Sequence, residues 1–233
     1  MALSTNTIGQ GRATLAGEVR GEIERLIVEG ELAAGVKLNE LSLSNAMGVS
    51  RGTVREAIRS LADSGLIDLI ANRGAFVHET TLDEIRNLYD LRGAIFAMAC
   101  SACARRMADG DTPHLARKLE TNLERMQKAN DSNDPKAYYP LNIEFHDLIL
   151  ENAGNPRAKA MYDNMIKEMH LFRRRGLSNA TNIARSLEEH RAISDAIIAG
   201  DTDAARRAGE QHTTSGFTRY LSQADKADTS AAD

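Results

Sequence analysis

The sequence has no tryptophan, and only 4% of its 233 residues are aromatic, so Leu, Ile, Ala and Met must fill the interior. This composition favours helices, and a total of four prolines leaves room for long uninterrupted ones. The two cysteines, Cys100 and Cys103, are too few for the disulfide framework of a small secreted protein. We interpret them as small packing residues, since no second pair accompanies them to complete a zinc site.

The sequence also has no apolar run long enough to cross a membrane. The first residues, MALSTNTIGQGR, lack the apolar core of a secretion signal. We therefore expect a soluble, cytoplasmic protein with no membrane partner. The formal net charge of −4 argues against a protein that coats nucleic acid without specificity, although a local basic face remains compatible with it.

Hydrophobic spacing and turn residues divide the chain into two domains, which its length allows. In the first domain, residues 1–79, helical patterns precede two short strand-like runs around an Asn-Arg-Gly turn. Three helices followed by a β-hairpin are the order of a winged helix-turn-helix. The expected helices are 15–28, 39–47 and 50–64, and the expected strand runs are 66–70 and 75–77.

The second domain, residues 80–225, shows helical patterns alone, separated by turn signals. We expect an all-helical bundle here and a mainly α protein as a whole. The last residues, 226–233, are small and polar and are expected to be disordered. The six expected helices are 81–108, 112–130, 135–153, 155–176, 181–199 and 201–224.

The third helix carries arginines four residues apart, at positions 51, 55 and 59, on a face separate from its apolar residues. Such a row can reach phosphates and guanine edges in a major groove. Ser50 and Thr53 add hydroxyl groups suited to phosphate contact near the start of the helix. The alternative is an ordinary solvated face, because residues 1–79 carry eight Lys or Arg against ten Asp or Glu.

The turn between the two strand runs would form the wing. It contains Arg73, which could enter a minor groove or meet the DNA backbone, followed by Gly74. Arginine is thus concentrated at the helix and the turn that this order of elements would present to DNA.

The strings GVSRGTVREAI, residues 48–58, and RGAFV, residues 73–77, resemble the GntR family of bacterial regulators. The resemblance implies that Ser50, Arg51, Thr53 and Arg55 touch operator DNA and that Gly74 shapes the wing. Some relatives place an arginine in the second helix, where this sequence has Asn-Glu-Leu-Ser at 39–42, so that contact is not expected.

The helical half contains a set of candidate metal ligands. Asn142 and His146 lie four apart on one expected helix, and His190 and His212 lie on two others. Three imidazoles and one amide oxygen could converge on a divalent ion inside a bundle, and this donor set suits Zn, Ni or a similar metal. The alternative is that these histidines are ordinary core or surface residues.

Residues 81–222 resemble the FCD ligand-binding domain that accompanies many GntR-type domains, through Phe145-His146, Asn155-Pro156 and the run 189–193. The resemblance implies metal ligands at Asn142, His146, His190 and His212. The family usually has Asp where this sequence has Asn142, so one negative charge is missing at the metal. We therefore expect the metal to bind more weakly than in those relatives, or an anionic effector to bind more strongly. Six helices indicate the VanR-type branch of the FadR-like regulators.

Arg92 is our candidate for gripping an effector carboxylate, since a guanidinium can hold one through two hydrogen bonds. A surface salt bridge is the alternative. Phe96 stands where family members often have Glu, so a larger and partly apolar effector could fit. The run Arg173-Arg174-Arg175 is expected to be mostly solvated, with at most one member lining the cavity.

These features predict a homodimeric transcriptional regulator on a pseudo-palindromic operator, with one winged helix per half-site. A small, carboxylate-bearing effector would bind near the metal and relieve repression. One alternative is a direct metal sensor without an organic effector, for which chelation alone would change operator binding. The other is a metal-dependent enzyme, which we do not favour because the metal motif includes no evident general base.

Overall fold

The computed structural model describes residues 14–230, which form two compact units divided between Thr80 and Thr81. The predicted division lies one residue earlier. Residues 1–13 and 231–233, including the end of the expected tail, lie outside the described residues. The described chain is mainly helical, as the sequence predicts, with one small two-stranded sheet.

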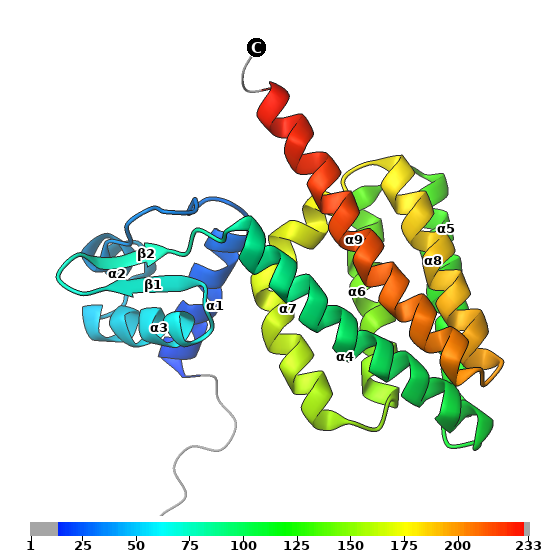
Figure 1. Cartoon of the computed structure of the whole chain (residues 1–233). Helices are drawn as coiled ribbons and strands as arrows, with labels where there is room; N and C mark the ends of the chain where they lie inside the picture. Colours follow the sequence, from blue (N-terminus) through cyan, green and yellow to red (C-terminus); the bar gives the residue numbers. More distant parts are fainter. Residues whose placement is uncertain (1–13, 231–233) are drawn as a thin grey trace, which may run out of the picture. The chain divides into compact units, whose positions relative to one another are not determined.

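The N-terminal unit contains three helices followed by a hairpin (Figure 1). Its core is formed by the apolar stripe of the first helix, with Val19 and Ile23, against Val54, Ile58 and Leu61 of the third. This is the predicted winged helix-turn-helix order. The elements are α1 (Leu15–Val28), α2 (Glu40–Met47), α3 (Arg51–Asp63), β1 (Ile67–Ile70) and β2 (Gly74–Val77).

Local capping explains where α2 and α3 begin and end. The side chain of Asn39 accepts hydrogen bonds from the amides of Leu41 and Ser42, which starts α2. Gly48 ends that helix in the left-handed conformation, with φ of 66°, which favours glycine. The side chain of Ser50 then accepts from the amide of Thr53 and starts α3. The turn of the helix-turn-helix is therefore determined by neighbouring residues.

The wing is an antiparallel hairpin in which Ile67 pairs with Val77 and Ile70 pairs with Gly74. Its turn passes through Asn72, which has a positive φ of 61°. The segment Val36–Leu38, between α1 and α2, pairs with β2 through the Leu38 amide and the Ala75 carbonyl, 2.8 Å apart. This pairing fixes the start of α2 beside the wing.

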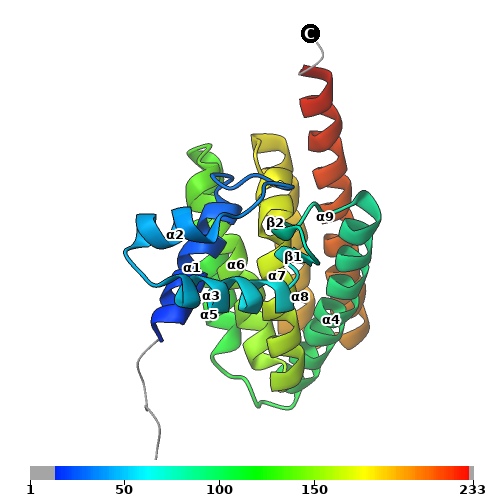
Figure 2. The same cartoon turned by 90° about the vertical axis from the view of Figure 1, so that its left-hand side faces the viewer.

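The C-terminal unit is a bundle of helices in which α4 and α9 pack side by side (Figures 1 and 2). The rings of Phe96, Tyr138, Phe145 and Tyr162 are the largest fully buried side chains of its core. No helix among residues 14–230 is long and apolar enough to cross a membrane. The helices are α4 (Leu82–Ala108), α5 (Leu115–Asp131), α6 (Pro135–Asn152), α7 (Pro156–Gly176), α8 (Ala180–Ile198) and α9 (Thr202–Ser230).

Two details differ from the sequence-based expectation. Helix α5 begins at Leu115, because the preceding residues form a turn closed by the Leu115 amide and the Thr112 carbonyl. Helix α9 continues to Ser230, so residues 226–230 extend the helix and are not an irregular tail. Lys226 and Ala227 are good helix formers, which is compatible with this extension. Cys100 and Cys103 are free and buried, as expected of packing residues.

Candidate functional site

The outer face of α3 carries the predicted DNA-contacting arginines. Val54, Ala57, Ile58 and Leu61 are buried on one side of the helix, and the arginines at 51, 55 and 59 are exposed on the other. A helix with one fully buried face and one cationic, exposed face can dock on a polyanion without disturbing its own core. At the start of α3, the hydroxyl groups of Ser50 and Thr53 lie 2.8 Å apart.

Glu40, on α2, pairs with two of the arginines of α3. Its carboxylate accepts two hydrogen bonds from Arg55, at 3.1 and 2.7 Å, and lies 3.8 Å from Arg51. These hydrogen bonds, followed by the surrounding positive charge, hold the pKa of Glu40 below its usual range, so the residue is ionised at neutral pH. In the sequence, Glu40 is notable only because some relatives have an arginine in this region, residues 39–42. Its role appears when α2 and α3 are brought together.

The wing and the start of α2 enclose a groove of about 580 Å³ that gathers cationic side chains. Lys37, Arg51 and Arg73 line it, and the Arg73 guanidinium lies 5.6 Å from the centre of the Phe76 ring. Gly74 has a φ of 108°, and a Cβ there would lie 3.2 Å from the Lys37 side chain. Lys37 was not a sequence-based candidate, because only the pairing of its segment with β2 brings it to the wing.

The C-terminal unit brings the three candidate histidines together in its core. His146 of α6, His190 of α8 and His212 of α9 are buried, and their ligand nitrogens lie within 4.8 Å of one another. The Nε2 atoms of His146 and His212 are 3.2 Å apart. Two nitrogens bound to one tetrahedral zinc ion lie about 3.3 Å apart, since each Zn–N bond is about 2.0–2.1 Å. The donor set therefore fits a divalent transition metal.

Neighbouring side chains orient two of these imidazoles. The Glu189 carboxylate lies 2.7 Å from Nδ1 of His212, so Nδ1 carries the proton and the lone pair of Nε2 faces the cluster. The Tyr162 hydroxyl lies 3.1 Å from Nδ1 of His146. Nδ1 of His190 is buried with no hydrogen-bond partner among the described residues. Neither Tyr162 nor Glu189 was a sequence-based candidate, although Glu189 directly precedes the candidate ligand His190.

All three imidazoles are neutral at physiological pH. Burial, followed by the positive charges of Arg92 and Arg173, holds the pKa of His146 well below its usual range. Burial and the proximity of His212 lower the pKa of His190, and burial and Arg219 lower that of His212. A neutral imidazole has a free lone pair, so the environment that disfavours protonation favours metal binding.

Asn142 lies beside the histidines, but its oxygen has another partner. Its Oδ1 atom accepts a hydrogen bond of 2.7 Å from Arg173, and its Nδ2 atom lies 3.4 Å from Nε2 of His190. The predicted fourth ligand thus lies next to His190 with its amide nitrogen toward that ring. For Oδ1 to serve as a metal ligand, the amide would have to turn and release Arg173.

Arg92 is buried in this site, so the surface salt bridge that we considered for it is wrong. It donates a hydrogen bond of 3.0 Å to the Tyr162 hydroxyl, and its NH2 atom lies 3.3 Å from Nε2 of His146. Phe96 is fully buried, with its ring centre 4.2 Å from that of His146, so it packs on the cluster. Arg92, Arg173 and His212 line one cavity of about 20 Å³, which has room for about one water molecule.

Two family models match the chain. Residues 15–77 match the gntR family of bacterial regulatory proteins, and residues 87–215 match the FCD domain. The first match covers the helix-turn-helix and the wing, and the second covers the helices that supply the three histidines.

Relatives of nearly the same length agree with these matches. The chain is 31% identical over 190 residues to the HTH-type transcriptional repressor RspR of Escherichia coli, with 82% of each chain covered. It is 25% identical over 187 residues to the HTH-type transcriptional regulator YdhC of Bacillus subtilis, covering 80% of this chain and 82% of YdhC.

The same fold occurs in the solved structure of E. coli McbR/YncC, with a TM-score of 0.72 at 19% identity, covering 91% of this chain and 99% of that one. These relatives are regulators of transcription and not enzymes. The chain therefore belongs to the GntR family of bacterial transcriptional regulators, and its second unit is an FCD domain.

Proposed function

We propose that the protein is a cytoplasmic repressor that binds a pseudo-palindromic operator as a homodimer and is released by a small carboxylate-bearing effector. Membership of the GntR family carries the DNA-binding part of this proposal. The single observation that carries the sensing part is the cluster of three buried histidines beside the buried guanidinium of Arg92. The bundle of six helices formed by residues 82–230 supports the VanR-type branch.

At the operator, the exposed face of α3 would enter the major groove and the wing would meet the adjacent backbone or minor groove. Arg51 and Arg55 would read base edges or phosphates, with Ser50 and Thr53 on the backbone. Arg73 would contact DNA from the wing, whose sharp turn requires Gly74. The small number of Lys and Arg in residues 1–79, eight, and the net charge of −4 favour a specific complex over general affinity for DNA.

In the C-terminal unit, His146, His190 and His212 would hold a divalent ion, with zinc as the first candidate and nickel as the second. Asn142 would contribute its amide oxygen. A bound cation would polarise and orient a carboxylate oxygen of the effector, while Arg92 would grip the same or another carboxylate through charged hydrogen bonds. Effector binding would then favour one arrangement of the two DNA-binding units of the dimer over another.

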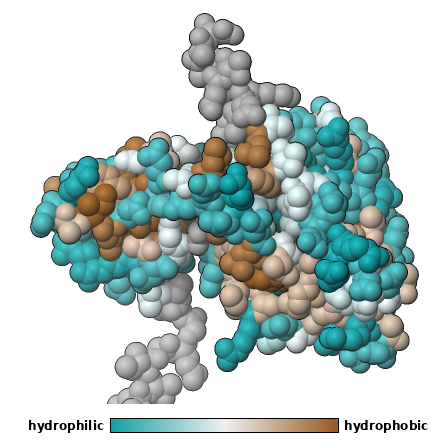
Figure 3. Space-filling view, in the orientation of Figure 1, coloured by the Kyte–Doolittle hydropathy of each residue, from teal (hydrophilic) through white to brown (hydrophobic). Residues whose placement is uncertain are grey.

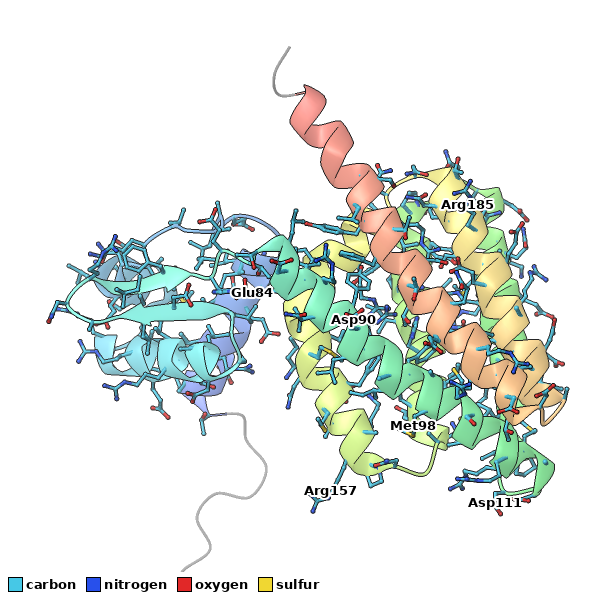
Figure 4. All side chains as sticks on the ribbon, in the orientation of Figure 1. Glu84, Asp90, Met98, Asp111, Arg157 and Arg185 are labelled. Carbon is cyan, nitrogen blue, oxygen red and sulfur yellow. The ribbon has the colours of Figure 1, made fainter. Side chains whose placement is uncertain are left out.

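A second copy of the chain is the partner that a two-fold symmetric operator requires. Helix α4 carries exposed large apolar side chains, Leu91 and Met98. Figure 4 labels Met98, and Figure 3 shows apolar patches among hydrophilic surface on the same face of the C-terminal unit. These residues offer apolar area for a dimer contact. Sedimentation of the full chain at micromolar concentration would measure the mass directly.

The test begins with the operator, selected from a random duplex library by the purified full-length protein. Fluorescence anisotropy then measures operator affinity with EDTA, with zinc, and with zinc plus each member of a panel of small carboxylic acids. We expect weaker operator binding only when zinc and one of the acids are both present. A change caused by zinc alone would support the direct metal sensor instead. Operator binding that never changes would contradict the sensing role.

A further inference from the structure

The buried charges of the C-terminal unit do not balance. Arg92, Arg173 and Arg219 are buried, whereas no Asp or Glu is buried among the side chains that the structure describes. Arg219 is compensated, because it donates hydrogen bonds of 2.7 and 2.9 Å to the partly buried Glu189. Arg92 and Arg173 have no ion pair with a described carboxylate.

The partners of these two arginines are neutral. Arg92 donates to the Tyr162 hydroxyl and faces the uncharged His146, and Arg173 donates to the Asn142 amide oxygen. Such hydrogen bonds satisfy the donors but leave two positive charges in the interior. A buried charge without a counter-ion is strongly destabilising, so structural stability alone does not account for keeping both.

Both guanidinium groups line the same cavity. Its other lining residues include Asn142 and His212 and no acidic residue among the part of the chain described. One ligand that carries two negative charges would therefore compensate both arginines at one place. Because the cavity holds only about 20 Å³, such a ligand must displace the ends of the lining side chains on entry, and the flexible arginines can move.

We infer that the ligand of this site is a small dianion, with one anionic group on Arg92 and the second on Arg173. This inference rests on the proposed function, in which Arg92 alone grips a carboxylate, and it adds a second anchor on α7. A dicarboxylate of few carbon atoms is the ligand class that supplies both charges and displaces the fewest lining atoms on entry.

The hydrogen bond between Arg173 and Asn142 links this ligand to the metal. In this structure Arg173 holds the only oxygen of the Asn142 side chain. An anionic group that accepts the hydrogen bonds of Arg173 in place of Asn142 releases this oxygen, which can then turn toward the histidines. The dianion and the metal should therefore increase each other's affinity by the same factor. Asp, with two oxygens, could serve Arg173 and a metal at once, so this coupling is specific to Asn at position 142.

Arg173→Gln tests the inference, with Arg157→Gln as its matched control. Arg157 lies on the same helix and is exposed, pointing away from the bundle (Figure 4). Thermal unfolding and calorimetric titration of the full chain, treated with EDTA, are compared in succinate, butyrate and inorganic phosphate. Sodium chloride keeps the ionic strength equal. Succinate and butyrate have the same chain length and differ by one carboxylate.

We expect succinate or phosphate to raise the melting temperature of the unsubstituted protein and of Arg157→Gln. We expect succinate to bind about 10-fold or more tightly than butyrate, since a hydrogen bond to a charged group contributes about 1.5–3 kcal/mol. Arg173→Gln should lose this preference for succinate. In sodium chloride alone, its melting temperature should be no lower than that of Arg157→Gln. The inference is overturned if neither dianion stabilises the protein, if Arg173→Gln keeps the preference, or if it unfolds well below the control.

Operator binding by the same proteins separates this inference from the proposed function. If succinate stabilises the protein through Arg173 and operator affinity never changes, the dianion site stands and the proposed control of DNA binding fails. Suppose instead that a monocarboxylate releases the operator as effectively as a dicarboxylate does, and that it also releases the operator from Arg173→Gln. The proposed function then stands, and the inference of a dianionic ligand is wrong.

Discussion

The two units of this protein use arginine in opposite ways. On α3 of the N-terminal unit, the side chains of Arg51 and Arg55 are 59% and 52% exposed and share the carboxylate of Glu40. In the C-terminal unit, Arg92 and Arg173 are 2% and 5% exposed and have only neutral hydrogen-bond partners. Exposed charges are stabilised by water, whereas buried charges need a counter-ion nearby.

This difference indicates two kinds of anionic partner. An exposed row of arginines suits a large polyanion that approaches from solvent, such as duplex DNA. A buried pair suits a small anion that enters the bundle and is enclosed. The comparison would fail if the exposed arginines did not contribute to operator binding, or if the buried ones proved to be purely structural.

The largest expected effect is the loss of the metal in His190→Ala. Residues that only orient a metal ligand contribute about 10- to 100-fold to affinity, so loss of a ligand should weaken zinc binding by more than about 100-fold. Metal content after dialysis and competition with a chelator measure this. His114→Ala is the control, since His114 is exposed and at the N-terminal end of α5. Full zinc occupancy in His190→Ala would show that the cluster is not a metal site.

The second prediction concerns the stability of the EDTA-treated protein in mild acid. The folded-state pKa of each clustered histidine is lowered, so below pH 6.5 the unfolded chain binds more protons than the folded one. Stability should therefore fall as the pH decreases from 7 to 5, by up to about 1.4 kcal/mol per pH unit for each histidine. Urea unfolding measures the fall. His190→Gln should flatten the profile, and an equally steep profile would contradict the assignment.

On the exposed side, Arg51→Ala and Arg55→Ala should each weaken specific operator binding by roughly 1–3 kcal/mol without unfolding the protein. Anisotropy with the selected operator gives the affinities, and circular dichroism shows whether the fold is kept. Arg191→Ala, on α8 of the C-terminal unit, is a control for the loss of one exposed positive charge. Unchanged operator affinity in both α3 variants would mean that another surface reads the DNA.

The smallest effect is expected for Glu40→Gln. Glutamine keeps an oxygen that accepts from Arg55 but removes the negative charge close to the expected DNA surface. Affinity for DNA of any sequence should rise a few-fold, with a lower ratio of specific to non-specific binding, because Arg55 is held less firmly. Protein stability should change by less than about 1 kcal/mol, as for other exposed ion pairs. An unchanged ratio would show that Glu40 does not position Arg55.

Local chemistry explains why most of the fold could be predicted from the sequence. Helix boundaries depend on residues such as Asn39, Gly48 and Ser50, whose capping roles act over three or four positions. Apart from the C-terminal end of α9, which lies six residues beyond its predicted end, the predicted helices agree with the structure to within about one turn. The pairing of Val36–Leu38 with β2 could not be predicted in this way, since it joins residues almost 40 positions apart.

The site shows the same limit. The histidines could be proposed from spacing and resemblance because each lies on a regular helix. Arg173 differs from an ordinary member of an arginine run because its side chain is buried. The run Arg173-Arg174-Arg175 does not by itself show which of its members lies on the buried face of the helix. Likewise, the contact of Glu189 with both His212 and Arg219 depends on the packing of α8 against α9.

The most direct test of the account is to measure the coupling between operator and ligand in both directions. Operator affinity of the zinc-loaded protein is measured with and without saturating succinate, and succinate affinity with and without saturating operator. We predict that succinate weakens operator binding at least about fivefold and that the operator weakens succinate binding by the same factor. In His190→Ala, both factors should fall to one. The account would be contradicted if, in the unsubstituted protein, succinate did not change operator affinity and the operator did not change succinate affinity.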